Sequence, residues 1–400
     1  MDSVTTTGYE DDYPSLASDG SNLFLAWQGY NADSDRVFLR EQSGGRWGEP
    51  VEVTEKPADV FMTAVTAAAG RVTVIWSERD GANWHLKART RASGAWSAVE
   101  TLTSGDGANF FHRAAAGSDG GIHVVYQSTR RALSDIYLRS FTGGRWSREI
   151  RISESPTSDW SPAVAVDHAG VAWVAWDSYA TGSYNVLLRG VRNGRPGDVV
   201  RVTDSTRFHA HPTLAVDSQN RVWVAWDEAP ENWGKDVGFL LTGGTGLYDS
   251  RTIKVSAYAG GRWATPLRQP GDMVPYGYRR YFHTPRLVAD GAGSIWLLAR
   301  PRTSARLPTT LWAAGGKWEV VATRYSGDRW SDLQIVPGSV GRNEGEIAAV
   351  ADSGSVAVAL VSDHRSWGGP NFGDAPRNND VLFARLRTAE PSAAAQVAPR

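Results

Sequence analysis

The chain has 400 residues, a formal net charge of −1, 42 glycines, 18 tryptophans and no cysteine. The balanced charge gives no reason to expect a nucleic acid or an anionic membrane as a partner, and no apolar run is long enough to span a bilayer. The lack of cysteine excludes disulfides, thiolate metal sites and cysteine nucleophiles. The length alone would suggest two or three domains, but an internal repeat changes that expectation.

Seven copies of one pattern follow each other along the chain. Each copy has a short apolar run, a turn rich in Asp and Gly, and an alternating run of β-branched and aromatic residues, which predicts two strands joined by a tight turn. The first five copies are 49 or 50 residues apart, and the last two steps are 73 and 61 residues. Repeats of this length with several strands predict a β-propeller. The copies begin at Pro14, Thr63, Arg113, Pro162, Pro212, Pro285 and Glu346.

A second motif follows most of these strand pairs at a fixed distance. It is a Gly-Gly-Arg-Trp sequence or a close variant, and it lies between two further strand-like segments, such as 136–141 and 149–153. Two adjacent glycines suit a hairpin turn because both accept positive φ. Each repeat is therefore expected to form one blade of four antiparallel strands. The motif ends at Trp47, Trp96, Trp146, Trp263 and Trp330.

The last blade lacks this second hairpin after its third strand at residues 381–387. Residues 3–7 precede Pro14 as residues 201–205 precede Pro212, so the N-terminal strand is expected to complete the last blade and close the ring. We therefore predict an all-β, seven-bladed propeller over residues 1–387. Residues 388–400, rich in Ala, Pro and Ser, are expected to be a disordered tail or a linker to a C-terminal domain.

No signal peptide is recognisable at the start of the sequence. If the chain is a mature or trimmed form, its location is extracellular or periplasmic, and a cytoplasmic location stays open. One face of the propeller would carry the short, uniform turns and the other the long, variable loops, among them residues 227–250, 269–282 and 363–380. Function is expected on the variable face, because loops on a rigid scaffold commonly carry it.

The Gly-Gly-x-Trp hairpins resemble a degenerate Asp-box (BNR) repeat of sialidase-like propellers, over residues 1–387. The sequence departs from true sialidases, which have six blades, because it lacks a complete Ser-x-Asp-x-Gly-x-x-Trp box and a Phe-Arg-Ile-Pro segment. Residues 109–126, with His112 and His123, are instead similar to the ulvan-lyase and rhamnosidase-like propellers that act on uronate polysaccharides. In that group the histidine before the inner strand belongs to the active centre. The resemblance implies a secreted bacterial protein that binds carbohydrate.

The residues just before each inner strand differ from blade to blade, and four of the eight histidines occur there. The inner strands of a propeller surround its channel, so these side chains are expected to meet at the channel mouth. Two of them are two residues apart and could hold zinc with a third, but no carboxylate or cysteine accompanies them, and we expect neither a metal nor another cofactor. The four are His112, His209, His211 and His283.

Basic and phenolic residues precede the sixth copy at Arg279, Arg280 and Tyr281. With Arg113 and the histidines, they supply the three groups that β-elimination from a uronate needs: a cation for the carboxylate, a base for the C5 proton and an acid for the leaving oxygen. We predict His211 or His112 as the base, Tyr281 as the acid, and Arg280 or Arg113 at the carboxylate. Expected substrate-binding residues are Arg113, His209, His283, Arg279, Trp160, Asp227 and Trp233.

Two alternatives remain open at this stage. Acidic residues on the variable face could form a glycosidase pair in a sialidase-like hydrolase, although such residues more often hold arginines or loops. The chain could also be a non-catalytic propeller that binds a glycan or a protein beside another enzyme domain. The acidic residues are Asp177, Asp227, Glu228 and Glu344, and further aromatics suited to stacking on sugar rings are Tyr179 and Trp367.

Overall fold

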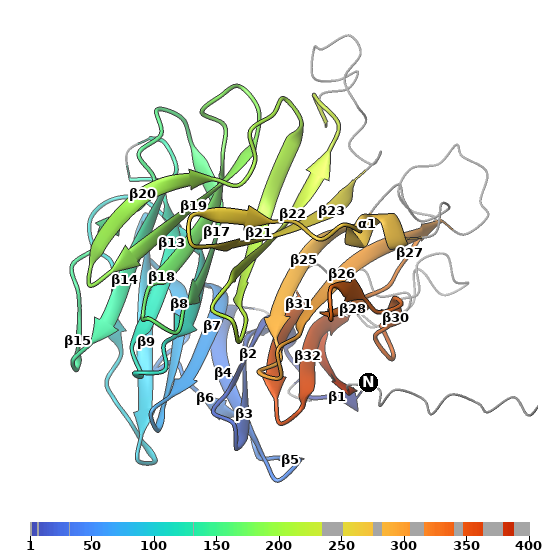
Figure 1. Cartoon of the computed structure of the whole chain (residues 1–400). Helices are drawn as coiled ribbons and strands as arrows, with labels where there is room; N and C mark the ends of the chain where they lie inside the picture. Colours follow the sequence, from blue (N-terminus) through green and yellow to red (C-terminus); the bar gives the residue numbers. More distant parts are fainter. Residues whose placement is uncertain are drawn as a thin grey trace, which may run out of the picture.

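A computed structural model describes residues 2–5, 8–31, 33–130, 132–233, 251–274, 282–304, 316–339, 347–362 and 379–387. Within these ranges the regular structure is β-strand apart from the short helix α1 (Pro270–Met273). Seven antiparallel sheets follow one another around a ring, coloured from blue to red along the chain (Figure 1). The predicted seven-bladed propeller is therefore confirmed.

Blades one to three share one pattern: three long strands, then two strands of two residues that both pair with the third. Blade one consists of β2 (Glu10–Ser18), β3 (Asn22–Asn31), β4 (Ser34–Ser43), β5 (Arg46–Trp47) and β6 (Val51–Glu52). Blade two consists of β7 (Val60–Ala68), β8 (Arg71–Asp80), β9 (Asn83–Ala92), β10 (Ala95–Trp96) and β11 (Glu100–Thr101). Blade three consists of β12 (Asn109–Ala116), β13 (Ile122–Ser128), β14 (Asp135–Thr142), β15 (Arg145–Trp146) and β16 (Ile150–Arg151).

Blades four to seven vary this pattern, and the last one includes the N-terminal strand. Blade four consists of β17 (Asp159–Val166), β18 (Ala172–Ser178), β19 (Asn185–Arg192) and β20 (Arg195–Arg201), and blade five of β21 (Phe208–Val216), β22 (Val222–Ala229), β23 (Thr252–Ala259) and β24 (Arg262–Ala264). Blade six consists of β25 (Phe282–Ala289), β26 (Ile295–Ser304), β27 (Gly316–Trp318), β28 (Val321–Ser326), β29 (Arg329–Trp330) and β30 (Gln334–Ile335). Blade seven consists of β31 (Ile347–Asp352), β32 (Ser355–Ser362), β33 (Asp380–Arg387) and β1 (Asp2–Ser3).

The outer strand differs from the sequence prediction, because in four blades it is split in two rather than continuous. In three of these blades a serine follows the hairpin tryptophan. The Oγ atoms of Ser97, Ser147 and Ser331 accept the backbone N–H of Thr90 (3.2 Å), Ser140 (3.1 Å) and Arg324 (3.0 Å), in place of a backbone carbonyl. A side chain therefore interrupts the ladder locally.

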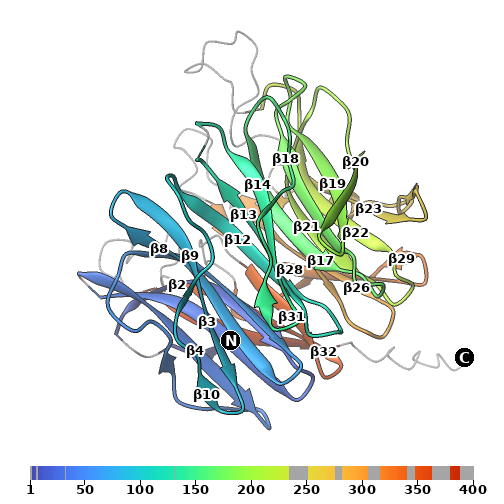
Figure 2. The same ribbon diagram turned by 90° about the vertical axis from the view of Figure 1, so that its left-hand side faces the viewer.

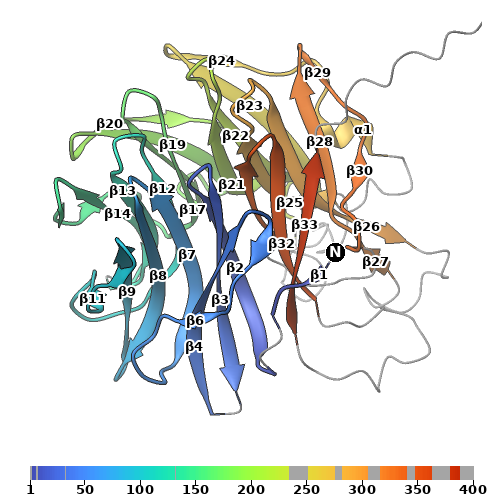
Figure 3. The ribbon, with the colours of Figure 1, turned by 90° about the horizontal axis from the view of Figure 1, so that it is seen from below.

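The N-terminal segment closes the ring as predicted. Asp2 lies opposite Phe383 in the β1–β33 pair, and the N–H of Val4 donates to the carbonyl of Val381 (2.9 Å). Figure 3 shows β1 beside β33, and Figure 2 shows the blue first blade next to the red last one. The two ends of the propeller thus share one sheet, which leaves no unpaired edge between them.

The core is distributed over the interfaces between blades. In the described part of the chain, seven clusters of buried apolar residues each join two adjacent blades. The middle-strand tryptophans Trp27, Trp76 and Trp176 are fully buried in them. The hairpin tryptophans lie at the edges of these clusters, as Trp96 and Trp146 show. The sequence interpretation of the repeating tryptophans as packing residues is confirmed.

The turn between the first two strands is held by an aspartate in at least three blades. Asp217 Oδ1 accepts backbone N–H groups of the turn, and its Oδ2 accepts the indole N–H of Trp223 (2.7 Å). Asp167 and Asp290 hold Trp173 (3.0 Å) and Trp296 (3.2 Å) in the same way. This bond ties the turn to the tryptophan and explains why aspartate recurs there.

The inner strands carry one irregularity that positions the site. In six blades the pairing between the first two strands shifts by a bulge near the start of the inner strand. One residue of each bulge has a positive φ between 49° and 58°, although none is glycine. Such a conformation costs energy and redirects the side chain. The bulge residues are Tyr13, Met62, Phe111, Ser161, His211 and Thr284.

Candidate functional site

The six bulge residues line the mouth of the central channel. Phe111, Ser161, His211 and Thr284 line a cavity of about 700 Å³, which we call the mouth cavity, and Tyr13 and Met62 line a smaller one of about 140 Å³. Arg113 and Arg286 line both, so the two cavities adjoin. The bulges therefore gather side chains from distant parts of the chain at one opening.

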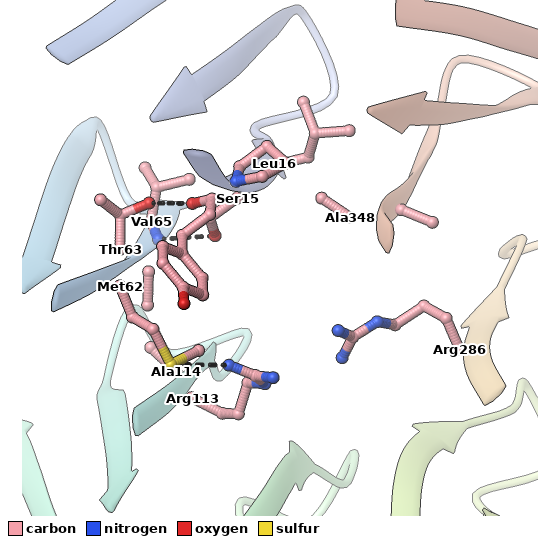
Figure 4. Close-up of a pocket in the computed structure, with 13 residues that line it drawn as sticks. Ser15, Leu16, Met62, Thr63, Val65, Arg113, Ala114, Arg286 and Ala348 are labelled. Atoms are coloured by element: carbon pink, nitrogen blue, oxygen red, sulfur yellow. Dashed lines mark hydrogen bonds between the residues drawn. The ribbon is translucent and has the colours of Figure 1, made fainter. Parts of the chain in front are cut away.

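Arg113 and Arg286 occupy equivalent positions, two residues after the bulge in blades three and six. Figure 4 shows that they extend toward one another from opposite walls of the channel. Arg113 Nη1 donates to the carbonyl of His112 (3.2 Å), and Arg286 Nε donates to the carbonyl of Ile347 (2.9 Å). Two guanidinium groups are thus held facing the same space, an arrangement suited to an anionic group. Small residues take this position in the other four bulged blades: Ser15, Ala64, Ala163 and Thr213.

A hydrogen bond between neighbouring blades holds several of the bulges. The middle-strand side chain Gln28 accepts the N–H of Met62 (3.1 Å) in the next blade. In the same way, Asp177 accepts the N–H of His211 (3.1 Å), and Asp227 accepts that of Thr284 (3.0 Å). These carboxylates thus have a structural role that a glutamine fills elsewhere.

Asp227 also contacts the functional groups of blade five. It is fully buried, and its Oδ2 lies 2.9 Å from Nδ1 of His211 and 2.5 Å from a guanidinium nitrogen of Arg251. Arg251 is itself buried, and its guanidinium lies over the ring of Trp233, 5.0 Å from the centroid. The buried carboxylate is therefore paired with a cation, as buried charges need to be. The His211 side chain remains half exposed.

The contacts of His211 influence which of its two ring nitrogens carries the proton. Nδ1 lies between Asp227 and Arg251, the latter at 2.7 Å. When Nδ1 carries the proton it donates to Asp227, and Nε2 is then the unprotonated nitrogen of a side chain that lines the mouth cavity. When Nδ1 accepts from Arg251 instead, Nε2 carries the proton. Asp227 and Arg251 thus favour opposite tautomers, and the carboxylate favours the one that can act as a base.

The mouth cavity has an excess of positive charge. Among the described residues its wall carries four arginines and one aspartate. Burial, followed by the charges of Arg251, Arg300 and His211, lowers the pKa of His283 well below its usual range, so His283 is neutral at physiological pH. Burial raises the pKa of Asp177 to about 6. The electrostatics of this wall favour an anionic ligand. The four arginines are Arg113, Arg251, Arg286 and Arg300.

Aromatic rings form one side of the mouth cavity. Trp160 and Tyr184 come from blade four, and Phe208 and Trp233 from blade five. Neighbouring rings contact each other, with centroids 5.4 Å apart for Trp160 and Tyr184 and 4.8 Å apart for Phe208 and Trp233. A cavity with apolar rings and a few oriented polar groups is typical of a small-molecule or sugar site.

Most of the described residues that the sequence analysis proposed converge here. Arg113, Trp160, His211, Trp233 and His283 line the mouth cavity, and Asp227 lies behind His211. Tyr281, Arg279 and Arg280 lie outside the described residues, as do Glu344, Trp367 and the tail at 388–400.

Two of the proposed histidines have other surroundings. His112 is fully buried, its Nε2 donates to the carbonyl of Ile75 (3.2 Å), and burial lowers its pKa to about 3. His209 accepts the indole N–H of Trp226 at Nδ1 (3.1 Å) and donates from Nε2 to Ser205 Oγ (2.8 Å). Neither lines the mouth cavity. Both rings are buried and hydrogen-bonded within the fold, and their predicted roles in catalysis and binding remain predictions.

The three described acidic residues of the alternative hydrolase site are each engaged within the fold. Asp177 and Asp227 are buried and hydrogen-bonded as described, and Glu228 pairs with Arg207 (3.3 Å). Among the described residues, no three His, Asp or Glu side chains gather as they would around a metal ion. Within those ranges there is also no helix with the length and apolar character of a membrane span.

Several residues of the mouth cavity were not among the site residues predicted from the sequence, among them Tyr184, Arg251, Arg286 and Arg300. Arg286 had a detectable signal, because it matches Arg113 once the repeats are aligned on the bulge. No signal in the sequence pointed to Arg251, since it directly precedes β23 after a long insertion and reaches His211 only through the folding of blade five.

Comparison with known proteins gives the fold a context. No family model and no curated protein matches the sequence. A solved structure described as a polysaccharide lyase of the PL25 ulvan lyase family is similar, with a TM-score of 0.60, 10% identity and 96% coverage of both chains. The polysaccharide lyase Uly1 has a TM-score of 0.57 at 9% identity, over 96% of this chain and 91% of Uly1. The endosialidase of phage phi92 has a TM-score of 0.50 at 12% identity, over the whole of this chain and 70% of the endosialidase. At such identities the likeness defines the fold alone, a propeller architecture that includes carbohydrate-active enzymes.

Proposed function

We propose that this protein cleaves an acidic, uronate-containing polysaccharide by β-elimination at the mouth cavity. The observation that carries the proposal is the placement of the half-exposed His211, backed by Asp227, in one cavity with the converging guanidinium groups of Arg113 and Arg286. An imidazole base and a paired cation are the two groups that this reaction needs first.

In the proposed reaction, the uronate carboxylate binds between Arg113 and Arg286. Their positive charge stabilises the negative charge that develops on the carboxylate side of the ring when C5 loses its proton. Nε2 of His211 takes that proton, and the imidazolium that forms is stabilised by Asp227. The C4–O bond then breaks, a double bond forms between C4 and C5, and the leaving oxygen takes a proton from an acid.

Two phenols are candidates for that acid. Tyr184 lines the mouth cavity, and burial, with the charge of Asp177, raises its pKa, so it is protonated at neutral pH. Tyr281 is the candidate from the sequence. Replacing each by phenylalanine distinguishes them, because loss of the acid lowers kcat by about 10²–10⁴-fold whereas loss of a packing hydroxyl leaves kcat nearly unchanged.

The test of the reaction is incubation with a panel of uronate polysaccharides, followed by ultraviolet absorbance of the unsaturated product. We expect absorbance to rise with at least one polymer, and to stop rising in His211→Ala. Reducing ends that form without absorbance would indicate a sialidase-like hydrolase instead. Binding to a polymer without either signal would indicate a non-catalytic binding propeller.

A further inference from the structure

A second cavity lies beside the mouth cavity on the rim of blades four and five. It measures about 100 Å³, and Tyr184, Phe208 and Trp233 line both cavities. Tyr179 and Asn232 line only the second one, which we call the rim groove. The two cavities therefore share a wall of aromatic rings.

The rings of this wall form a continuous series from one cavity to the other. The ring centroids are 5.1 Å apart for Tyr179 and Tyr184, 5.1 Å for Tyr184 and Phe208, and 4.8 Å for Phe208 and Trp233. Such rings expose apolar faces beside polar groups, the combination that a pyranose ring with its C–H face and hydroxyl edge requires.

The two cavities differ in charge. The rim groove has one arginine and one glutamate in its wall, whereas the mouth cavity has four arginines and one aspartate. The charge of Arg207 in the groove is compensated by Glu228 (3.3 Å), and Thr206 donates a hydrogen bond to Glu231 (3.4 Å). The groove therefore lacks the excess cation that would hold a carboxylate or a sulfate.

We infer that the rim groove binds an uncharged sugar unit of the same polysaccharide chain whose uronate occupies the mouth cavity. This inference rests on the proposed function, and it adds that the substrate carries an uncharged unit near the charged one and crosses the rim between blades four and five. Chains long enough to fill both cavities then bind more tightly than shorter chains that occupy the mouth cavity alone.

The experiment compares a full-length polymer that the wild type cleaves with the shortest oligosaccharide of that polymer that is still cleaved. In Tyr179→Ala we expect KM for the polymer to rise about tenfold, the effect of losing one ring contact. KM and kcat for the shortest oligosaccharide stay at the wild-type values, because it does not reach the groove. Tyr179→Phe keeps the ring and retains most of the affinity for the polymer.

Tyr30→Ala is the matched control, since Tyr30 is an exposed tyrosine (41%) at the end of a middle strand in blade one. It should leave both substrates unaffected. An unchanged KM of Tyr179→Ala for the polymer, or an equal loss on both lengths, would overturn the inference while the proposed function stands.

If no polymer of the panel is cleaved, the proposed function fails, and the groove is then tested by electrophoresis through gels that contain each polymer. Weaker retardation of Tyr179→Ala than of the wild type and Tyr30→Ala supports the groove as a sugar site. Equal retardation, or no retardation of the wild type, overturns it.

Discussion

The inner-strand bulges of blades three and five have the same backbone geometry, but they place their histidines in different environments. In blade five the positive-φ residue is His211 (φ 54°), which opens into the mouth cavity. In blade three it is Phe111 (φ 51°), and the next residue, His112, points into the interface between blades two and three. A difference of one residue in register thus separates a half-exposed imidazole at the channel from a buried one.

This difference shows that the position of a residue relative to the bulge, more than its type, decides whether its side chain reaches the channel. The same rule explains Arg113 and Arg286, which both lie two residues after a bulge and both reach the channel. Four measurements can sharpen or contradict the comparison between the two bulges.

The largest effect is expected for the two histidines themselves. His211→Ala should lower kcat by about 10²–10⁴-fold, because the base is lost, and it should remain folded since the side chain is half exposed. His112→Asn should lower thermal stability but leave kcat of the folded protein near the wild-type value. A loss of kcat in His112→Asn similar to that in His211→Ala would contradict the comparison.

The second effect concerns the arginines after the bulges. Arg113→Met and Arg286→Met should each lower kcat by about 10²–10³-fold, since each removes one cation from the developing charge. Arg145→Met, at an exposed position on the outer strand of blade three, is the control. Normal activity in either channel variant would show that the carboxylate binds elsewhere.

The third effect concerns the partner of His211. Asp227→Asn keeps an oxygen for the N–H of Thr284 but loses the charge that favours a proton on Nδ1. We expect kcat to fall on the order of tenfold to hundredfold with little change in KM. The melting temperature should fall as well, because the buried Arg251 loses its charge partner. The equivalent change Asp177→Asn alters a carboxylate that accepts the backbone N–H of His211 and a hydrogen bond from Ser161, and it should reduce kcat far less.

The smallest effect is on stability. The pKa values of His112 and His209 are lowered by burial to about 3 and about 4, from an ordinary 6.5. The unfolded chain therefore binds more protons than the folded one below pH 6.5, and stability falls as the pH drops from 6.5 toward 4. The pKa values of Asp177 and Asp159, both raised by burial to about 6, act in the opposite direction over pH 4–6 and reduce this fall.

We expect a melting temperature on the order of 5 °C lower at pH 5 than at pH 7 by calorimetry. His168→Ala, which removes an exposed histidine, should not alter that difference. A melting temperature that is the same at both pH values would contradict the burial of His112 and His209.

The architecture could be predicted from the sequence because it depends on a periodic signal. The spacing of the aspartate turns and Gly-Gly hairpins specified seven blades, and residues 3–7 matched the missing strand of the last one. The interruption of the outer strand was not predictable from hydrophobic periodicity, since it depends on side-chain bonds such as that of Ser147.

The site could be predicted only in part. The non-repeating residues before each inner strand indicated the channel mouth and included His211. The copy in blade three was set one residue out of register, at Arg113, because repeat spacings of 49 and 50 residues fit equally well and no proline marks the end of its bulge. Arg251 could not be found, since its contact with Asp227 joins two strands separated by a long insertion.

The pairing of β1 with β33 has a consequence for folding of the protein. Asp2 and its partner Phe383 lie near opposite ends of the propeller sequence. This pair therefore closes a longer loop of chain than any other strand pair of the described residues, and its closure carries the largest entropic cost. The opening between blades one and seven closes only when this pair forms, and the channel that both adjoin acquires its final shape in that step.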